Sequence, residues 1–212
     1  LQRRGEALFE QAFGGDTLNT AAYLARLARG RFGVDYATAL GDDPYSAAMI
    51  AEWQEEGIGV DRIRRLPGRL PGLYVIRTDA KGERSFYYWR GEAAARAMFA
   101  DSEGAALAAA LAGYDWLYLS GITLSVLGAE GRARLMETLD RLRARGGRVA
   151  FDGNYRPRGW ASADEARAAF TAALGRVDLA LPTLDDERAL FGDRDAETCI
   201  ARLIAAGVRE VA

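Results

Sequence analysis

Segments with strand-like and with helical patterning alternate along most of this chain, and this alternation constrains the fold more than any other feature. Short apolar runs typical of strands cover residues 34–40, 114–121, 148–154 and 177–182. Amphipathic stretches typical of helices cover residues 128–147, 162–175 and 195–208. Strands that alternate with helices favour an α/β fold with a mainly parallel sheet.

One segment interrupts the alternation, "GLYVIRTDAKGERSFYYWRG" at residues 72–91. Its two β-rich runs are joined by a polar loop that contains Lys81-Gly82, which predicts a hairpin rather than a helix-linked strand. We expect the hairpin to leave the main sheet as a flap. Since side chains alternate across a strand, Tyr87 and Trp89 would face one side, and Tyr88 and Arg90 the other. Because both faces carry aromatic side chains or a guanidinium, we expect one face to meet the core or another subunit and the other face to meet a ligand.

A glycine pair, Gly14-Gly15, precedes an amphipathic stretch that begins near Leu18. Either Asp16 or Thr17 can cap this helix, and Gly30 supplies a stop. The glycines allow the main chain to approach another group closely, with Asn19 one turn further on. A tight turn followed by a cap explains the same residues equally well. A second cap is predicted at Asp43, with Pro44 in the first turn of a helix that ends near residue 57.

Composition excludes several classes of function. The 212 residues contain 28 basic and 30 acidic side chains, so the small net charge argues against nucleic acid as a partner. The absence of histidine excludes Ser-His-Asp and Cys-His catalysis and histidine metal sites within this sequence. Cys199 is the single cysteine, which excludes an intramolecular disulfide and favours a cytoplasmic location. No apolar run reaches membrane-spanning length, so we expect no membrane partner.

Polar residues follow the predicted strands where each one ends, at the edge where open α/β sheets bind ligands. These groups are Gly41-Asp42-Asp43, Ser120-Gly121, residues 152–156, and Thr183 with Asp185 and Asp186. Each has a local explanation as a cap, a turn or a first-turn acid. Their shared placement favours a ligand site. Arg156 and Arg158 flank Pro157, and a forked guanidinium suits a carboxylate or a phosphate, although loop arginines are usually solvated. Neither a Walker sequence nor a dinucleotide fingerprint is present.

Five stretches together make the chain similar to a known family. They are "FGGDTLNTAAYLAR", "LPGLYVIRTDAKGERSFYYWR", "YLSGI", "FDGNYRPRGWAS" and "LPTLDDERALFG". In this order and over nearly the whole length, they resemble the ribokinase-like, or phosphofructokinase-B-type, carbohydrate kinases, and most closely the bacterial branch that acts on a sugar acid. The resemblance implies a mainly parallel sheet with helices on both faces, within one domain over residues 1–212, and a small β lid formed by residues 72–91 and part of 1–13.

The resemblance also assigns roles to residues. It implies that Gly14 and Gly15 let the main chain approach the sugar acid and that Asp16 and Asn19 lie beside its hydroxyls. Tyr74 and Tyr87 match aromatic positions of the lid, Arg90 is a further substrate-binding candidate, and Arg156 matches the arginine that holds the carboxylate. On the nucleotide side it implies Asn154, Thr183 and Asp186 as positions near the phosphates, the last in a motif linked to magnesium. That motif begins with Asn and ends with Glu in the wider family, where this chain has Thr and Asp.

The implied reaction is ATP-dependent phosphorylation of the 6-hydroxyl of 2-keto-3-deoxygluconate, with Mg²⁺. In-line transfer needs a positioned hydroxyl, a base and neutralisation of the transferred group. The resemblance places the base, an Asp that ends a glycine-rich segment, beyond Ala212. We therefore expect this sequence to be truncated at both ends and inactive by itself, with no catalytic residue of its own and with metal ligands undefined.

Three alternatives stay open. A ribose or fructose kinase would share the fold but act on a substrate without a carboxylate. A non-catalytic sugar-acid binding or regulatory protein would lack the downstream Asp. A nucleotide-binding α/β protein unrelated to sugars would leave the aromatic hairpin without a role. The preference between the gluconate and galactonate epimers and the need for a monovalent cation are not readable from the sequence, and the second face of the hairpin favours a homodimer or a higher homo-oligomer.

Overall fold

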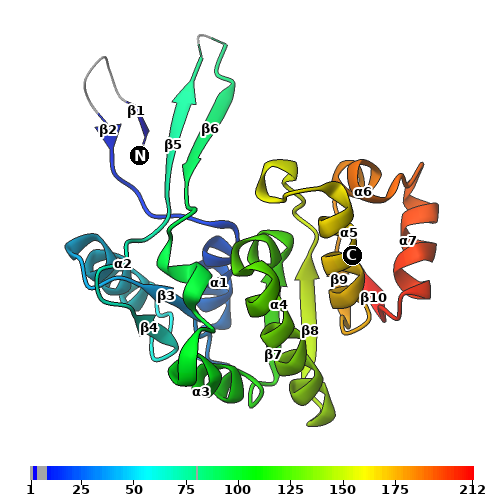
Figure 1. Ribbon diagram of the computed structural model, residues 1–212, viewed down its shortest axis with the longest axis horizontal. Coiled ribbons are helices and arrows are strands. Elements are labelled where there is room, and N and C mark those ends of the chain that lie inside the picture. Colours follow the sequence, from blue (N-terminus) through cyan, green and yellow to red (C-terminus); the bar gives the residue numbers. More distant parts are fainter. Residues whose placement is uncertain (1, 4–8, 80) are drawn as a thin grey trace. The chain divides into compact units, whose positions relative to one another are not determined.

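The computed structural model describes residues 2–3, 9–79 and 81–212 (Figure 1). Contacts along the chain divide it into two compact units, Leu1–Met98 and Phe99–Ala212. Both units contain parallel strand pairs connected through helices, so the α/β class expected from the alternation is confirmed. Among the described residues, no helix has both the length and the apolar character needed to cross a bilayer.

The first unit packs two helices against a pair of parallel strands. Its core contains Leu18 and Ala21 of the first helix, together with Leu40, Trp53 and Ile58. The two strands share a register in which Thr38 lies opposite Ile63. The elements of this part are α1 (Asp16–Ala28), β3 (Thr38–Leu40), α2 (Pro44–Glu55), β4 (Ile63–Arg65) and the short 3-10 helix η1 (Ala94–Ala97).

The two predicted helix caps have different outcomes. The Asp43 carboxylate accepts hydrogen bonds from the backbone N–H groups of Tyr45 and Ser46, both at 3.0 Å, so the cap of α2 is confirmed. The predicted cap of α1 is wrong, because the helix begins at Asp16 and Gly15 is its N-cap. The Thr17 hydroxyl instead lies 2.8 Å from the hydroxyl of Tyr36. Burial raises the pKa of that tyrosine to about 12.

A separate four-stranded sheet in the first unit contains the predicted hairpin (Figure 1). The antiparallel strands β5 (Leu73–Thr78) and β6 (Arg84–Trp89) confirm it. The Asp79 carboxylate holds the connecting loop by accepting from the N–H groups of Lys81 and Glu83. The strand β1 (Gln2–Arg3) pairs with both β2 (Phe9–Glu10) and β5. Of the lid segment expected within residues 1–13, residues 1 and 4–8 lie outside the described residues.

The second unit contains a parallel four-stranded sheet in the order β10-β9-β8-β7. Its core includes Phe151 of the central strand β8 and Phe170 of a covering helix, whose rings meet edge to face at 5.3 Å. Its elements are α3 (Asp101–Leu111), β7 (Trp116–Ser120), α4 (Gly121–Ala144), β8 (Arg148–Asp152), the 3-10 helix η2 (Pro157–Gly159), α5 (Ala163–Leu174), β9 (Leu179–Leu181), α6 (Leu184–Phe191), α7 (Ala196–Ala205) and β10 (Glu210–Val211).

Local sequence explains how these helices start and bend. Ser120 caps α4 in a reciprocal arrangement with Thr123. The helix continues beyond the predicted stretch in the N-terminal direction, with a kink at Gly128, where φ is 65°. Ser162 caps α5, since its hydroxyl accepts from the N–H of Glu165 at 3.1 Å. The Glu165 carboxylate accepts from the N–H of Ala161 and so reaches one residue further back than in a standard capping box.

Candidate substrate and phosphate sites

The glycine pair before α1 lies beside an aromatic side chain of the hairpin. A Cβ atom built on Gly14 would lie 3.0 Å from the Tyr74 hydroxyl oxygen and 3.9 Å from the Asn19 side-chain oxygen. A Cβ on Gly15 would meet nothing closer than Leu18, at 3.9 Å. Gly14 therefore leaves space for Tyr74, whereas no neighbouring atom requires a glycine at Gly15. The structure thus brings Gly14, Asn19 and Tyr74 together.

Asp16 begins α1 and lies between these residues in sequence. A carboxylate in the first turn of a helix complements the positive end of the helix dipole. The backbone carbonyl of Asp16 accepts from the Thr20 hydroxyl at 3.2 Å, and the N–H of Asn19 donates to the carbonyl of Gly15 at 2.8 Å. The first turn of α1 is therefore fixed by main-chain bonds.

The two faces of the hairpin carry different residues. Tyr74 lies directly across from Tyr88, and their ring centroids are 5.9 Å apart. The Arg90 guanidinium lies 4.7 Å from the centroid of the Tyr88 ring. Tyr87 pairs with Val75, one position along, so its side chain belongs to the opposite face.

The structure therefore groups Tyr74 with Tyr88 and Arg90 and separates Tyr74 from Tyr87. Sequence reasoning missed Tyr88 because alternation along one strand does not reveal which residue of the other strand lies opposite. Tyr87 and Tyr88 are exposed to nearly equal extents, 49% and 48%, and Trp89 is 61% exposed. Both faces of the hairpin are therefore accessible in this chain.

In the second unit, the loop after β8 is closely surrounded. A Cβ on Gly121, the first residue of α4, would overlap the carbonyl oxygen of Gly153 at 2.1 Å. A Cβ on Gly153 would lie 2.8 Å from the Glu187 Oε1 atom. The next residue, Asn154, has φ of 35°, in the left-handed region that asparagine tolerates better than most side chains. The start of this loop is therefore fixed between α4 and α6.

The same loop is tied to the first turn of α6 by Asp186. Its Oδ2 atom accepts from the backbone N–H of Tyr155 at 3.0 Å and from Arg156 Nη1 at 3.2 Å. Thr183 is the N-cap of this helix, and its hydroxyl does not cap it. The structure thus places Arg156, the predicted carboxylate-binding residue, against Asp186, the predicted phosphate-proximal acid. Sequence reasoning did not anticipate that pair.

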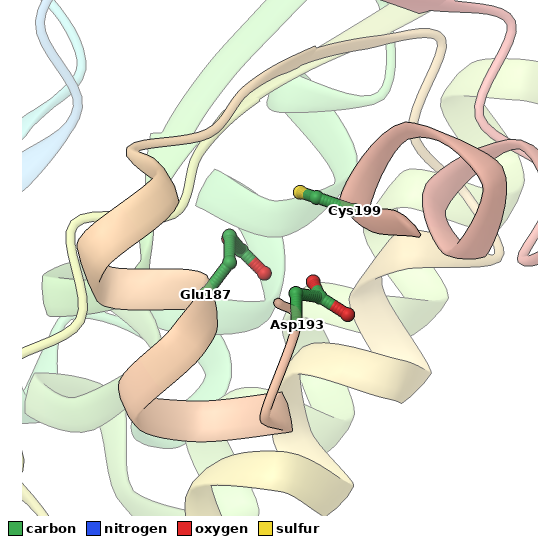
Figure 2. A group of neighbouring side chains, drawn as sticks. All are labelled: Glu187, Asp193 and Cys199. Atoms are coloured by element: carbon green, nitrogen blue, oxygen red, sulfur yellow. The ribbon is translucent and has the colours of Figure 1, made fainter. Parts of the chain in front are cut away.

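Three buried side chains, from α6, from α7 and from the connection between them, form a group with the spacing of metal ligands (Figure 2). One ligand atom from each of Glu187, Asp193 and Cys199 lies within 4.8 Å of the other two. The group already contains a protein cation, since Arg202 Nη2 donates to Glu187 Oε2 at 2.6 Å and to Asp193 Oδ2 at 2.7 Å. We call these four residues the Arg202 cluster.

The protonation of the Arg202 cluster also disfavours metal binding. Burial and the nearby carboxylates raise the pKa of the Cys199 thiol to about 11, so the thiol keeps its proton near neutral pH. Metals bind the thiolate form. Burial also raises the pKa of Glu187, an effect that Arg202 opposes. We therefore interpret the cluster as a structural ion pair network.

Comparison with known proteins matches this chain to a protein family. Residues 6–212 match the model of the pfkB family carbohydrate kinases. A 2-dehydro-3-deoxygluconokinase of Dickeya dadantii is 48% identical over 212 residues, which are 100% of this chain and 68% of the relative. The chain therefore belongs to the pfkB family of carbohydrate kinases, as the resemblance of its motifs indicated.

Two of the solved structures that are similar to this chain show its fold. The PfkB protein from Polaromonas sp. JS666 has a TM-score of 0.85 and 26% identity, covering 97% of this chain and 67% of that protein. The 2-dehydro-3-deoxygluconokinase from Thermotoga maritima has a TM-score of 0.80 and 25% identity, covering 97% of this chain and 64% of that protein. The ribokinase-like fold is confirmed. The chain spans about two thirds of the length of its curated relatives, between 64% and 68% for the four 2-dehydro-3-deoxygluconokinases it matches.

Proposed function

We propose that the protein containing this chain phosphorylates the 6-hydroxyl of 2-keto-3-deoxygluconate with ATP and releases 2-keto-3-deoxy-6-phosphogluconate. The observation that carries this proposal is 48% identity, along the entire chain, to a kinase named for this substrate under its synonym 2-dehydro-3-deoxygluconate. The geometry of the second unit supports it. An exposed arginine, Arg156, lies on the loop that follows β8, at the edge of the sheet where ligands bind in this class of fold.

The sugar acid needs donors for its hydroxyls, a cover and a cation for its carboxylate. In our proposal, the first turn of α1 supplies the donors and acceptors for the hydroxyls, and the hairpin supplies the cover. Arg156 supplies the cation, because a guanidinium forms strong charge-assisted hydrogen bonds with a carboxylate. The residues proposed to bind the substrate are Gly14, Gly15, Asp16, Asn19, Tyr74, Arg90 and Arg156. The family resemblance adds Tyr87, which lies on the opposite face of the hairpin from Tyr74.

The phosphate donor would be held near the first turn of α6. Asp186 offers a carboxylate, Asn154 an amide oxygen and Thr183 a hydroxyl, which are the hard oxygen ligands that Mg²⁺ and phosphate-bound Mg²⁺ prefer. When bound, ATP supplies the phosphoryl group and Mg²⁺ neutralises its charge. The residues of this chain would orient the two substrates. The family resemblance implies an Asp at the end of a glycine-rich segment as the proton acceptor, and we assign that role to no residue of this chain.

The pair between Arg156 and Asp186 must open for Arg156 to bind a substrate in this way. The Arg156 Nη1 atom lies 3.2 Å from Asp186 Oδ2, and half of the arginine side chain is exposed. An exposed pair of this kind contributes little to stability. Arg156 can therefore leave Asp186 and bind a substrate carboxylate at small cost.

The test is a coupled assay of ADP release with the full-length gene product. We expect 2-keto-3-deoxygluconate to be strongly preferred over fructose and ribose. Arg156→Ala should raise KM for the sugar acid roughly 10- to 100-fold with a smaller change in kcat, since it removes a charge-assisted hydrogen bond of about 1.5–3 kcal/mol. Arg158→Ala is the matched control, because this exposed arginine lies two residues away. Its KM should stay close to that of the wild type.

Other results would select the alternatives. A preference for fructose or ribose, with Arg156 dispensable, would identify a kinase of neutral sugars. Binding of the sugar acid without ADP release would identify a non-catalytic binding protein.

We also infer assembly and location. The exposed face of the hairpin that carries Tyr87 and Trp89 suits a second copy of the chain, because aromatic side chains are enriched at protein interfaces. A homo-oligomer formed there would cover these rings. The single cysteine, which is buried as a free thiol, favours a reducing compartment and hence the cytoplasm.

A further inference from the structure

Helix α6 contacts the candidate site on one side and the Arg202 cluster on the other, and Glu187 takes part in both contacts. Its Oε1 atom faces the position where Gly153 would carry a Cβ, at 2.8 Å. Its Oε2 atom accepts from Arg202 Nη2 at 2.6 Å. The residue is nearly fully buried, at 4% exposure. Only Glu187 thus separates the predicted ligand-binding loop from Arg202, a partly buried arginine on α7.

Gly153 is where this contact acts on the loop. It follows directly after β8, and its carbonyl oxygen lies against Gly121 on one side while Glu187 lies on the other. Because the peptide units on both sides of Gly153 are packed, the direction in which Asn154, Tyr155 and Arg156 leave the strand is fixed there. Removing the Glu187 side chain would open space on one side of Gly153 only.

Arg202 in turn fixes Glu187. Its guanidinium donates to both oxygens of Asp193, with Nε at 3.1 Å from Oδ1 and 3.0 Å from Oδ2. It also lies 3.9 Å from the centroid of the Phe191 ring. A planar guanidinium held by a carboxylate and an aromatic ring has few alternative orientations. The guanidinium therefore presents Nη2 to Glu187 in a defined position. Figure 2 shows its two carboxylate partners, Glu187 and Asp193.

We propose that Glu187 and Arg202 are positioning residues for the sugar-acid carboxylate, acting through Gly153 on Arg156. This inference rests on the proposed function, in which Arg156 binds that carboxylate. Neither residue touches the substrate. Arg202 orients Glu187, Glu187 packs against Gly153, and Gly153 sets the path of the loop that ends in Arg156. A misplacement of a binding group by about 1 Å is enough to cost up to two orders of magnitude in activity.

The first test is a double-mutant cycle in the full-length protein with Glu187→Ala and Arg156→Ala. Glu187→Ala alone should raise KM for 2-keto-3-deoxygluconate roughly tenfold, because the loop loses its support at Gly153. In the Arg156→Ala background, the same change should alter this KM by less than about twofold, because the group that Glu187 positions is already absent. A role of Glu187 in stability alone would give equal effects in both backgrounds and would overturn the proposal.

The second test uses conservative and control variants. Glu187→Gln keeps the contact with Gly153 and an acceptor for Arg202, so its KM should be close to that of the wild type. Arg202→Lys should resemble Glu187→Ala, since an ammonium lacks the fork that bonds Asp193 and Glu187 together. Arg188→Met is the control, because this arginine also lies on α6 but pairs with the exposed Asp185. A KM for Arg188→Met as high as that of Arg202→Lys would contradict the proposal.

A third measurement does not depend on activity. Hydrogen exchange of the backbone amides at residues 153–156 should accelerate in Glu187→Ala relative to the wild type, while amides in the core of α5 keep their protection. If the wild type fails to phosphorylate the sugar acid, the proposed function is wrong, and exchange still reports whether Glu187 fixes the loop. If the wild type is active but loop exchange is unchanged, the positioning role is wrong and the proposed function stands.

Discussion

The hairpin in the first unit and the loop after β8 in the second hold their candidate ligand-binding residues in opposite ways. The hairpin is fixed by a ladder of antiparallel pairing, and the aromatic side chains of β6 are about half exposed. The loop is packed between α4 and α6, and its support leads back to the buried carboxylates Glu187 and Asp193. One region holds its backbone and leaves its side chains accessible, whereas the other encloses the backbone from which Arg156 projects.

This difference predicts separate consequences of mutation in the two regions. Substitutions on an exposed strand face change few contacts within the folded protein, so their effects should fall on ligands and partners. Substitutions around the loop disturb buried charges, so their effects should fall on stability as well as on ligands. Variants on either side of this division therefore test it.

The largest expected effect is on stability, from Arg202→Met. This change leaves the carboxylates of Glu187 and Asp193, whose side chains are 5% and 4% exposed, without their cation. Breaking a buried ion pair on one side costs about 3–5 kcal/mol. We expect the lower end of that range, because Arg202 itself is 25% exposed and Glu187 can take up a proton. Urea unfolding at neutral pH measures the loss in free energy of unfolding.

Arg188→Met serves as the control for this measurement too. Its pair with Asp185 is exposed on both sides, and such pairs contribute at most about 1 kcal/mol. Equal losses for Arg202→Met and Arg188→Met would show that the cluster does not stabilise the second unit, and the contrast between the two regions would fail.

The second prediction separates the two faces of the hairpin. Tyr88→Leu should raise KM for the sugar acid roughly tenfold, because Tyr88 shares a face with Tyr74 and Arg90. Tyr87→Leu should leave KM nearly unchanged and weaken self-association, which sedimentation velocity measures over a range of concentrations. The resemblance to the kinase family predicts the reverse for KM, since it assigns Tyr87 to the substrate. A large KM effect from Tyr87→Leu, with none from Tyr88→Leu, would support that assignment.

Much of the fold could be predicted from the sequence, because periodicity, caps and turns are local signals. The hairpin at residues 72–91 and the caps at Asp43 and Ser162 follow from neighbouring residues alone. The strand predicted over residues 34–40 is shorter in the structure, where β3 begins at Thr38, because strand length depends on the partner. The prediction of a side-chain cap for α1 is wrong for a similar reason, because it also depends on a tertiary contact. A distant residue, Tyr36, provides the partner of the Thr17 hydroxyl.

The candidate site was predictable as a set of residues but not as an arrangement. Gly14, Arg156 and Asp186 are recognisable in their motifs. Which atoms meet depends on tertiary contacts, so the pair between Arg156 and Asp186 and the position of Tyr88 beside Tyr74 appear only in the structure. Glu187 gives no signal of its own in the sequence, since it follows two other acidic residues in the first turn of a helix and reads as one more first-turn acid.

The smallest expected effect is a pH dependence that originates at Glu187. Burial raises its pKa in the folded protein above the ordinary value of 4.5, so the folded state binds more protons than the unfolded state once the pH exceeds that value. Stability from this residue is therefore complete below about pH 4.5 and falls as the pH rises toward the folded-state pKa. Glu187→Gln removes this titrating carboxyl and leaves the other ionisable groups of the chain in place. The free energy of unfolding of Glu187→Gln relative to the wild type should accordingly increase between about pH 4 and pH 7, as measured by urea unfolding. A difference that stays constant over this interval would mean that Arg202 fully compensates the burial of Glu187, and the Arg202 cluster would then hold two charged carboxylates on one guanidinium.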